Sequence, residues 1–212
     1  MKHITFHLDF VSPYAYLAFE QLPQALLGLS YRIDYRPVLF GAILAHYGQL
    51  GPAEVPGKRE WTYRQVQWLA RQHGIPLHLP ATHPFNPLPL LRLALACGDG
   101  GLVNRWACET VLRHVWLSEA DAVDPQRLAQ LRAELAPRRD SGDAEVKAEL
   151  RANTDAAIAA GVFGVPALAV DDRLFWGFDA LPMLRAYLEG DAWFDTPAWH
   201  EAGQRPGVQR AR

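Results

Sequence analysis

Hydrophobic and polar residues alternate along the first ten positions of the chain. The apolar residues take every second position of 3–10, namely Ile4, Phe6, Leu8 and Phe10. A period of two predicts a β-strand with one buried face. At 14–27 the apolar residues recur with helical spacing, and we expect Pro23 to kink or divide this helix. A second strand is predicted over 31–37, which completes a β-α-β unit.

Helical spacing then dominates the middle of the chain. Six segments carry it, at 39–47, 58–73, 88–97, 102–117, 125–135 and 144–160. The strand pattern returns at 166–170 and 173–176 around a tight Asp171-Asp172 turn, and a last helix is predicted over 179–188. The element order therefore predicts an α/β fold, with a mixed four-stranded sheet interrupted by a helical insertion.

This order divides the 212 residues into three parts. We expect a discontinuous sheet domain over 1–38 and 161–192, a helical insertion domain over 39–160 and a C-terminal tail over 193–212. Residues from about 203 onward, with Arg205, Arg210 and Arg212, are expected to be frayed. The formal charge is −2, from 21 basic and 23 acidic residues, and no basic stripe precedes the tail. This balance argues against a nucleic-acid partner.

The N-terminus and the cysteines bear on the compartment. Met1-Lys2-His3 leads directly into the first strand, without the apolar run of a signal peptide, and no apolar stretch is long enough to span a bilayer. Cys97 and Cys108 form no CxxC motif, and the histidines form no helical HxxxH pair. We therefore expect a cytoplasmic protein with no metal site and no membrane partner.

Ser12 stands at the junction of the first strand and the first helix, followed by Pro13. There, unpaired N–H groups and the helix dipole favour an anion. A dipole contribution of up to about 2 kcal/mol, at roughly 1.4 kcal/mol per pKa unit, lowers the pKa of a bound thiol by about one unit. A serine hydroxyl that donates a hydrogen bond adds to this effect. The alternative is that Ser12 simply caps the helix, which the dipeptide alone favours.

Pro166 opens a strand after a loop bracketed by Gly161 and Gly164. Such a proline is a candidate for a cis peptide bond. A cis bond here aims the amide and carbonyl groups of Val165 outward, toward the backbone of an extended peptide ligand. The alternative is an ordinary proline at a strand edge.

Five motifs together resemble the kappa-class glutathione transferases and the 2-hydroxychromene-2-carboxylate isomerases, relatives of the DsbA-like thioredoxin fold. They follow the order of that family across most of the first 190 residues. The motifs are Asp9-x-x-Ser12-Pro13-Tyr14, Pro37-x-Leu39-x-Gly41, residues 48–58, Phe163-Gly164-Val165-Pro166 and Phe175-Trp176-Gly177-Phe178-Asp179. The resemblance implies a thioredoxin-like core with an inserted helical domain, glutathione as cofactor, and a homodimer.

The resemblance also implies roles for single residues. Ser12 corresponds to the serine that meets the glutathione sulfur, where redox members of the fold carry the first cysteine of CxxC. Ala15 takes the place of the second cysteine, which excludes dithiol exchange. Val165, before the expected cis Pro166, corresponds to the residue that pairs with the cysteinyl backbone. Asp179 corresponds to the acid that meets the γ-glutamyl ammonium group, although it also fits a helix cap.

The remaining glutathione-site residues carried over are Lys58, Gln49 and Phe178. Lys58 matches a lysine that reaches the tripeptide from the helical domain, or is a solvated lysine at a helix start. The chain departs from the family at Gln49, where Asn is frequent, at Gln65, where the family has an acid, and at Phe178, which replaces a small polar residue. These departures imply weaker glutathione binding or a preference for a related thiol.

The activity that the resemblance implies is glutathione-dependent isomerisation of a 2-oxo acid from aromatic catabolism. In that chemistry a thiolate adds reversibly to a conjugated carbon, a bond rotates, and the thiol leaves. Tyr14 and Asn86 are candidates for the substrate pocket, and Asn86 also fits a plain turn. A glutathione transferase shares every thiol-site residue, and a non-catalytic binding protein on the same fold, with Ser12 only as a cap, is the third alternative.

Overall fold

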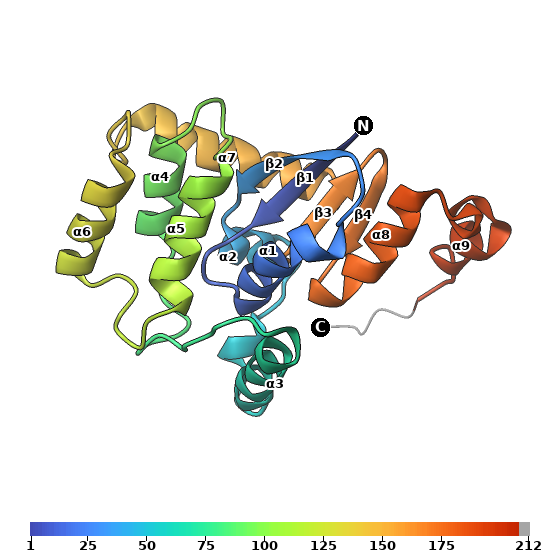
Figure 1. The fold of residues 1–212 in the computed structure, drawn as a ribbon, viewed down its shortest axis with the longest axis horizontal. Helices are drawn as coiled ribbons and strands as arrows, with labels where there is room; N and C mark the ends of the chain where they lie inside the picture. The colour runs from blue at the N-terminus through green and yellow to red at the C-terminus, as the bar shows by residue number, and fades with distance from the viewer. Residues whose placement is uncertain (208–212) are drawn as a thin grey trace.

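A four-stranded mixed sheet lies at the centre of the protein, whose computed structural model describes residues 1–207 (Figure 1). The strands are β1 (Lys2–Leu8), β2 (Tyr31–Pro37), β3 (Ala167–Val170) and β4 (Arg173–Trp176), in the order β2-β1-β3-β4. β1 pairs with β2 in parallel and with β3 antiparallel, and β3 pairs antiparallel with β4. The predicted α/β fold, with its βαβ and ββα halves, is confirmed.

The alternation of β1 separates two hydrophobic clusters on the two faces of the sheet. Ile4, Phe6 and Leu8 are fully buried in the larger cluster, which includes residues of α1 (Pro13–Ala25) and α8 (Leu181–Glu189). The smaller cluster joins α2 (Phe40–His46) and α7 (Ala144–Ala159) to Ala167 of β3. Both faces are thus covered by helices, as expected for a sheet with a parallel pair.

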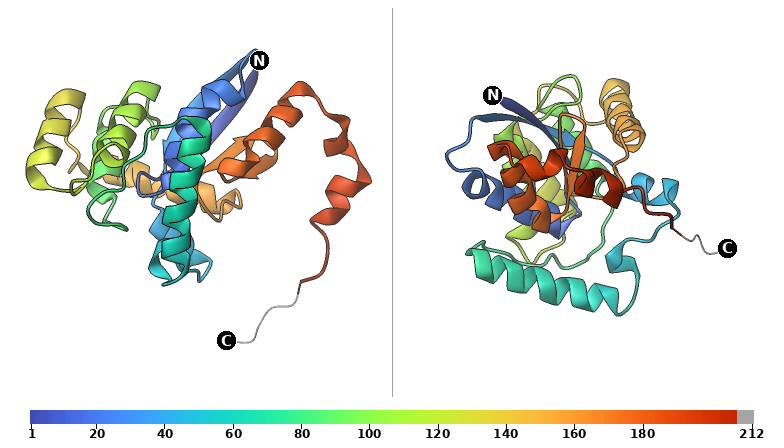
Figure 2. Two further views of the ribbon diagram at one scale, coloured as in Figure 1. Left: turned by 60° about the horizontal axis from the view of Figure 1, so that its bottom comes forward. Right: turned by 90° about the vertical axis from the view of Figure 1, so that its right-hand side faces the viewer.

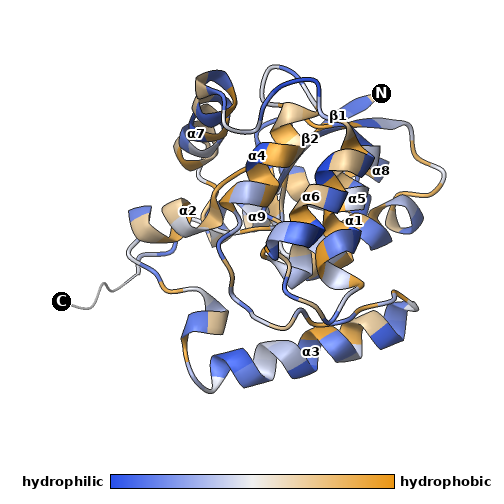
Figure 3. Cartoon of the chain, turned by 90° about the vertical axis from the view of Figure 1, so that its left-hand side faces the viewer, coloured by the Kyte–Doolittle hydropathy of each residue, from blue (hydrophilic) through white to orange (hydrophobic). Residues whose placement is uncertain are grey.

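Helices from the middle of the chain lie together on the side of the sheet away from α8 (Figures 1 and 2). Buried residues of α4 (Leu88–Ala96), α5 (Arg105–Trp116) and α6 (Pro125–Leu135) belong to the same cluster as β1 and α1. In contrast, α3 (Lys58–His73) runs apart, across the end of α1, and follows the short 3₁₀ helix η1 (Pro52–Glu54) (Figure 3). Only Thr62, Val66 and Ala70 of α3 are buried, so this helix is attached along one narrow face.

Three element boundaries differ from the predictions for local reasons. Pro23 does not divide α1, which continues to Ala25, because this proline lies in the last turn. The helix predicted from 102 begins at Arg105, since the side chain of Asn104 caps it by accepting a hydrogen bond from the N–H of Ala107 at 2.8 Å. A 3₁₀ turn, η2 (Phe178–Ala180), precedes the last predicted helix and delays its start to Leu181.

The prediction of a tail from residue 193 is wrong for its first ten residues, which form η3 (Ala192–Asp195) and α9 (Pro197–Ala202). The Arg173 guanidinium donates to the carbonyl oxygen of Phe194 at 2.6 Å, and its charge lies over the ring of Trp199. This cation anchors the C-terminal segment to β4. Arg205 is exposed, as expected, and Arg210 and Arg212 lie outside the described residues.

Within residues 1–207 no helix is both long and apolar enough to cross a membrane. The same part of the chain contains no cluster of three or more His, Cys, Asp or Glu residues that is suited to a metal ion.

Candidate active site

Ser12 is the N-cap of α1, and its hydroxyl group makes two contacts. The oxygen accepts a hydrogen bond from the N–H of Ala15 at 3.2 Å, which satisfies one of the free donors of the first turn. The hydroxyl also donates toward the carbonyl oxygen of Val165 at 3.4 Å, the long limit for such a bond. Ser12 therefore caps the helix and still holds a weakly engaged proton.

The loop opposite Ser12 carries the expected cis bond between Val165 and Pro166. The contact between Ser12 and Val165 joins positions 153 residues apart in sequence. Val165 is 6% exposed, and its N–H has no hydrogen-bond partner within residues 1–207. A buried N–H without a partner is rare in native proteins, so this group is suited to an incoming carbonyl oxygen.

Ser12 and Val165 lie in the wall of a cavity of about 1400 Å³. The residues around it come from the start of α1, the segment from α2 to α3, the loop before α4, and the loops on either side of β3 and β4. Sites for a single small ligand usually occupy roughly 300–1,000 Å³. This cavity is large enough for a tripeptide and a second small molecule together.

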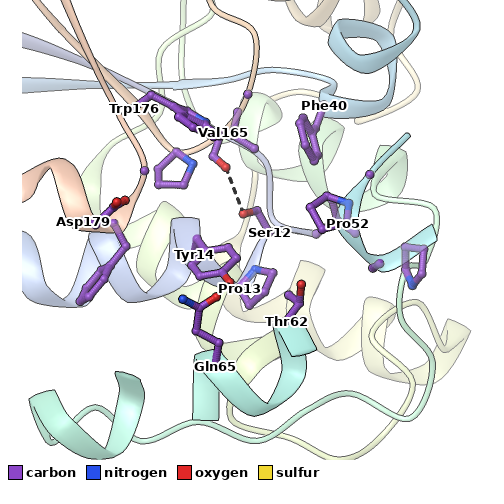
Figure 4. A pocket seen from close by; sticks show the side chains of 18 of the residues that line it. Ser12, Pro13, Tyr14, Phe40, Pro52, Thr62, Gln65, Val165, Trp176 and Asp179 are labelled. Carbon is purple, nitrogen blue, oxygen red and sulfur yellow. Dashed lines mark hydrogen bonds between the residues drawn. The ribbon is translucent and has the colours of Figure 1, made fainter. Parts of the chain in front are cut away.

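One side of the cavity is formed by Asp179 and Trp176 (Figure 4). Two glycines permit this wall, because side chains come unusually close to them. A Cβ at Gly177 (φ +97°) would lie 2.5 Å from a carboxylate oxygen of Asp179, and a Cβ at Gly164 would lie 2.6 Å from the indole nitrogen of Trp176. A side chain at Gly164 would therefore displace the Trp176 indole, and one at Gly177 would displace the exposed Asp179 carboxylate and strain the backbone at positive φ.

The opposite side is apolar, with Phe40 and Pro52 lying across Ser12 from Asp179 (Figure 4). Below Ser12, the Tyr14 hydroxyl donates to Oε1 of Gln65 at 2.7 Å. Burial, with a smaller contribution from Asp179, raises the pKa of Tyr14, so this residue is a neutral phenol at physiological pH. Gln65 thus fixes the orientation of Tyr14.

The structure brings together most of the predicted site residues. Lining the same cavity are Ser12, Tyr14, Gln49, Lys58, Val165, Pro166, Phe178 and Asp179. The ring of Phe178 is 93% buried and meets the His73 ring edge to face, 5.0 Å between centroids. It therefore closes the floor of the site and offers no hydrogen bond.

Asn86, predicted for the substrate pocket, is exposed and is not among the residues that line the cavity, although its neighbours Phe85 and Pro87 are. Its side-chain oxygen accepts a hydrogen bond from the N–H of Leu88 at 3.1 Å, just ahead of α4. The turn alternative, in which an asparagine bonds to the backbone two residues on, describes this residue.

Asp9 is fully buried behind Ser12. Its place in the Asp9-x-x-Ser12-Pro13-Tyr14 motif did not predict its structural role. One carboxylate oxygen accepts from the N–H of Val11 at 3.1 Å, and the other accepts from the N–H of Phe40 at 2.9 Å. Burial raises the pKa of Asp9 to about 7, against the opposite effect of these hydrogen bonds. A carboxyl group in this environment ties the loop before Ser12 to the start of α2.

Sequence reasoning also missed the apolar wall at Phe40 and Pro52, because a hydrophobic residue in a connecting segment carries no signal of what it faces.

The two cysteines are both free thiols, and burial raises the pKa of Cys97 and of Cys108. A raised pKa disfavours the thiolate, so neither cysteine supplies a nucleophile.

Comparison with known proteins agrees with this geometry. Residues 3–189 match the family described as "DSBA-like thioredoxin domain". The chain is 28% identical over 203 residues to a 2-hydroxychromene-2-carboxylate isomerase of Sphingobium xenophagum, covering 88% of this chain and 98% of the relative. It is 27% identical over 209 residues to glutathione S-transferase kappa 2 of Caenorhabditis elegans, covering 88% and 92%. A solved 2-hydroxychromene-2-carboxylate isomerase superposes with a TM-score of 0.74 at 22% identity, covering 96% of this chain and 100% of that one.

The buried Asp9 predicts a pH dependence of stability. Its pKa is about 7 in the folded protein against 3.8 for an ordinary aspartate, so between these values the folded state binds more protons than the unfolded chain. The free energy of unfolding therefore falls as the pH rises through this window. Asp9→Asn removes the titration, and the stability of the parent relative to this variant should fall from pH 4 to pH 7.

Urea denaturation at steps across this range measures the difference. Asp155→Asn, which removes an exposed carboxylate on α7, is the matched control. Parallel pH dependences of the parent and Asp9→Asn would contradict the assignment.

Proposed function

The chain belongs to the family of DSBA-like thioredoxin domains, and we propose that it is a glutathione-dependent isomerase acting on a 2-oxo acid derived from an aromatic compound. The observation that carries the proposal is the Ser12 hydroxyl, which faces Val165 across 3.4 Å at the N-terminus of α1. A thiolate placed there meets a hydroxyl donor and the positive end of a helix dipole. The names of the relatives, isomerases and glutathione transferases, support the same class of enzyme.

The residues around Ser12 fit glutathione. The unpartnered N–H of Val165 suits the backbone of an extended peptide, and the exposed Asp179 carboxylate suits an α-ammonium group. Lys58 lines the cavity at the start of α3 and suits a carboxylate. The peptide backbone, the ammonium group and a carboxylate of glutathione thus each have a partner in the cavity wall. Gln49 and Phe178 offer less polar contact than the family pattern.

When bound, glutathione supplies a nucleophilic thiolate. Ser12 holds that sulfur by donating its proton, and the α1 N-terminus lowers the free energy of the charged form. Phe40 and Pro52 receive the apolar part of the substrate on the other side of Ser12. The neutral phenol of Tyr14 lies next to Ser12; because its proton is donated to Gln65, its oxygen can accept a hydrogen bond from a donor group of the ligand.

A kappa-like glutathione transferase is the second candidate, favoured by the charge of the cavity. Apart from histidines, the basic residues among those that line it are Lys58 and Arg185. Arg185 donates to the carbonyl oxygens of Ala25 and Leu27 and pairs with Glu189. Lys58 is therefore the cation available to bind a substrate carboxylate. An uncharged electrophile needs no such partner, which favours a transferase.

Two measurements test the proposal. Calorimetry with reduced glutathione should show binding, and its absence would end the proposal in both forms. Turnover is then assayed with 2-hydroxychromene-2-carboxylate and with an electron-poor aryl chloride. An isomerase returns the thiol and consumes no glutathione, whereas a transferase consumes one thiol for each product, so the stoichiometry of thiol loss separates the two activities.

Substitution of Ser12 separates capping from thiol activation. Ser12→Ala costs about 1 kcal/mol of stability through the lost cap, whereas glycine at an N-cap costs only a few tenths. Ser12→Gly should therefore fold normally, yet raise the pKa of bound glutathione by about one to two units through loss of a charged hydrogen bond. Ultraviolet absorbance of the thiolate across a pH titration measures this pKa. An unchanged pKa would mean that Ser12 only caps the helix, as in a non-catalytic binding protein.

We also propose that the enzyme is a cytoplasmic homodimer. Three tryptophans of the helical part, Trp61, Trp68 and Trp106, are more than half exposed, which is unusual for side chains of this size. Two free cysteines suit a reducing compartment. Sedimentation equilibrium at micromolar concentration should give twice the mass of one chain, and a monomer at that concentration would refute the dimer.

A further inference from the structure

Side chains hold both peptide groups of Val11, the residue just before Ser12. Its N–H donates to Asp9 at 3.1 Å, and its carbonyl oxygen lies 2.7 Å from Nε2 of His83. His83 comes from the loop before α4, 72 residues further along the chain. A side chain from the helical part of the chain therefore fixes the loop that carries Ser12, the candidate catalytic residue.

The partners of His83 define its protonation. A carbonyl oxygen only accepts hydrogen bonds, so Nε2 carries a proton and donates it to Val11. Burial lowers the pKa of His83, which leaves the ring neutral at physiological pH and makes Nδ1 an acceptor. The hydroxyl group of Tyr63 on α3 lies 2.9 Å from this Nδ1 and also 2.9 Å from the carbonyl oxygen of His83. The Tyr63 hydroxyl has one proton, which these two acceptors of residue 83 share.

Aromatic contacts fix the plane of the ring. The His83 ring meets the fully buried Trp116 ring at 62°, 5.5 Å between centroids. Trp116 in turn donates from its indole nitrogen to the carbonyl oxygen of Phe10 at 3.1 Å. Two consecutive carbonyl groups before Ser12 are therefore bound by side chains from the helical part of the chain.

These contacts form a continuous chain behind Ser12, which we call the brace: Tyr63, His83, Val11, Asp9 and Phe40. Its last link is the 2.9 Å hydrogen bond from the N–H of Phe40 to Asp9. The brace connects α3, the serine loop and the first residue of α2. Each of these segments contributes to the cavity wall.

We propose that His83 is a positioning residue, which sets the place of the Ser12 hydroxyl and couples it to the seating of α3. Both ring nitrogens are engaged, Nε2 with Val11 and Nδ1 with Tyr63, so neither is directed at a substrate. This excludes a general base and leaves a role that acts through the backbone of Val11. The catalytic consequence rests on the proposed function, whereas the effect on the serine loop does not.

Two amide substitutions separate the functions of the ring nitrogens. In His83→Gln the amide nitrogen can reach the position of Nε2 and keep the bond to Val11, whereas in His83→Asn it reaches only the position of Nδ1. A misplaced reacting group costs up to about 100-fold in rate, so we expect kcat in His83→Asn to fall by roughly 10- to 100-fold, with KM for glutathione little changed. His83→Gln should recover most of this loss, and the pKa of bound glutathione should rise only in His83→Asn.

Hydrogen exchange of residues 9–15 in the ligand-free, full-length protein gives a readout that does not need glutathione. Exchange there should be faster in His83→Asn than in the parent, and close to the parent in His83→Gln. If the parent binds no glutathione, the proposed function fails and this measurement still decides on His83. Equal behaviour of the two amide variants in rate and in exchange would overturn the proposal.

Thermal denaturation confirms that each variant is folded. If His83→Asn does not fold, Tyr63→Phe replaces it, because this change frees Nδ1 while leaving the Val11 contact available. Faster exchange over 9–15 in Tyr63→Phe is then the expected result, and exchange equal to that of the parent would overturn the role of His83.

Discussion

The site depends on the hydrogen bonds of a short loop between β1 and α1. Where a strand ends beneath the start of a helix, the peptide groups of the connecting residues are buried and need partners. The carboxylate of Asp9 satisfies the N–H of Val11, and the ring of His83 satisfies its carbonyl oxygen; Asp9 also binds the N–H of Phe40 at the start of α2. Because these partners come from different segments, satisfying the loop also assembles the wall of the cavity.

The hydroxyl group of Ser12 makes two contacts of different kinds. Its oxygen accepts from Ala15, as a cap does, and its proton is left with a long contact to Val165. A cap uses the lone pairs of a hydroxyl group, whereas an anion is held by the proton, so the two functions do not compete. The two free cysteines, Cys97 and Cys108, lie elsewhere, at the end of α4 and in α5.

Local patterns were enough to predict most elements, including β2, β4, α3 and α6 with the observed bounds. The pairing of Ser12 with the cis loop came from the family resemblance, because each stretch alone fits a plain helix cap or a strand-edge proline. Contacts that depend on packing were not predictable. A histidine between prolines gives no sign that it will meet Val11, and Asn86 has the same composition signal in a pocket as in a turn. The helices after residue 191 depend on Arg173, whose stacking on Trp199 no periodicity reveals.

The two sides of the cavity differ in what evolution can change. On the Asp179 side, a methyl group at Gly164 or Gly177 would lie 2.6 Å from the Trp176 indole nitrogen or 2.5 Å from an Asp179 carboxylate oxygen, so that side chain would have to move. The opposite side includes the ring of Phe40, where a substitution changes the shape of the wall without touching the residues of the Asp179 side. The two sides of the cavity can therefore vary independently of each other.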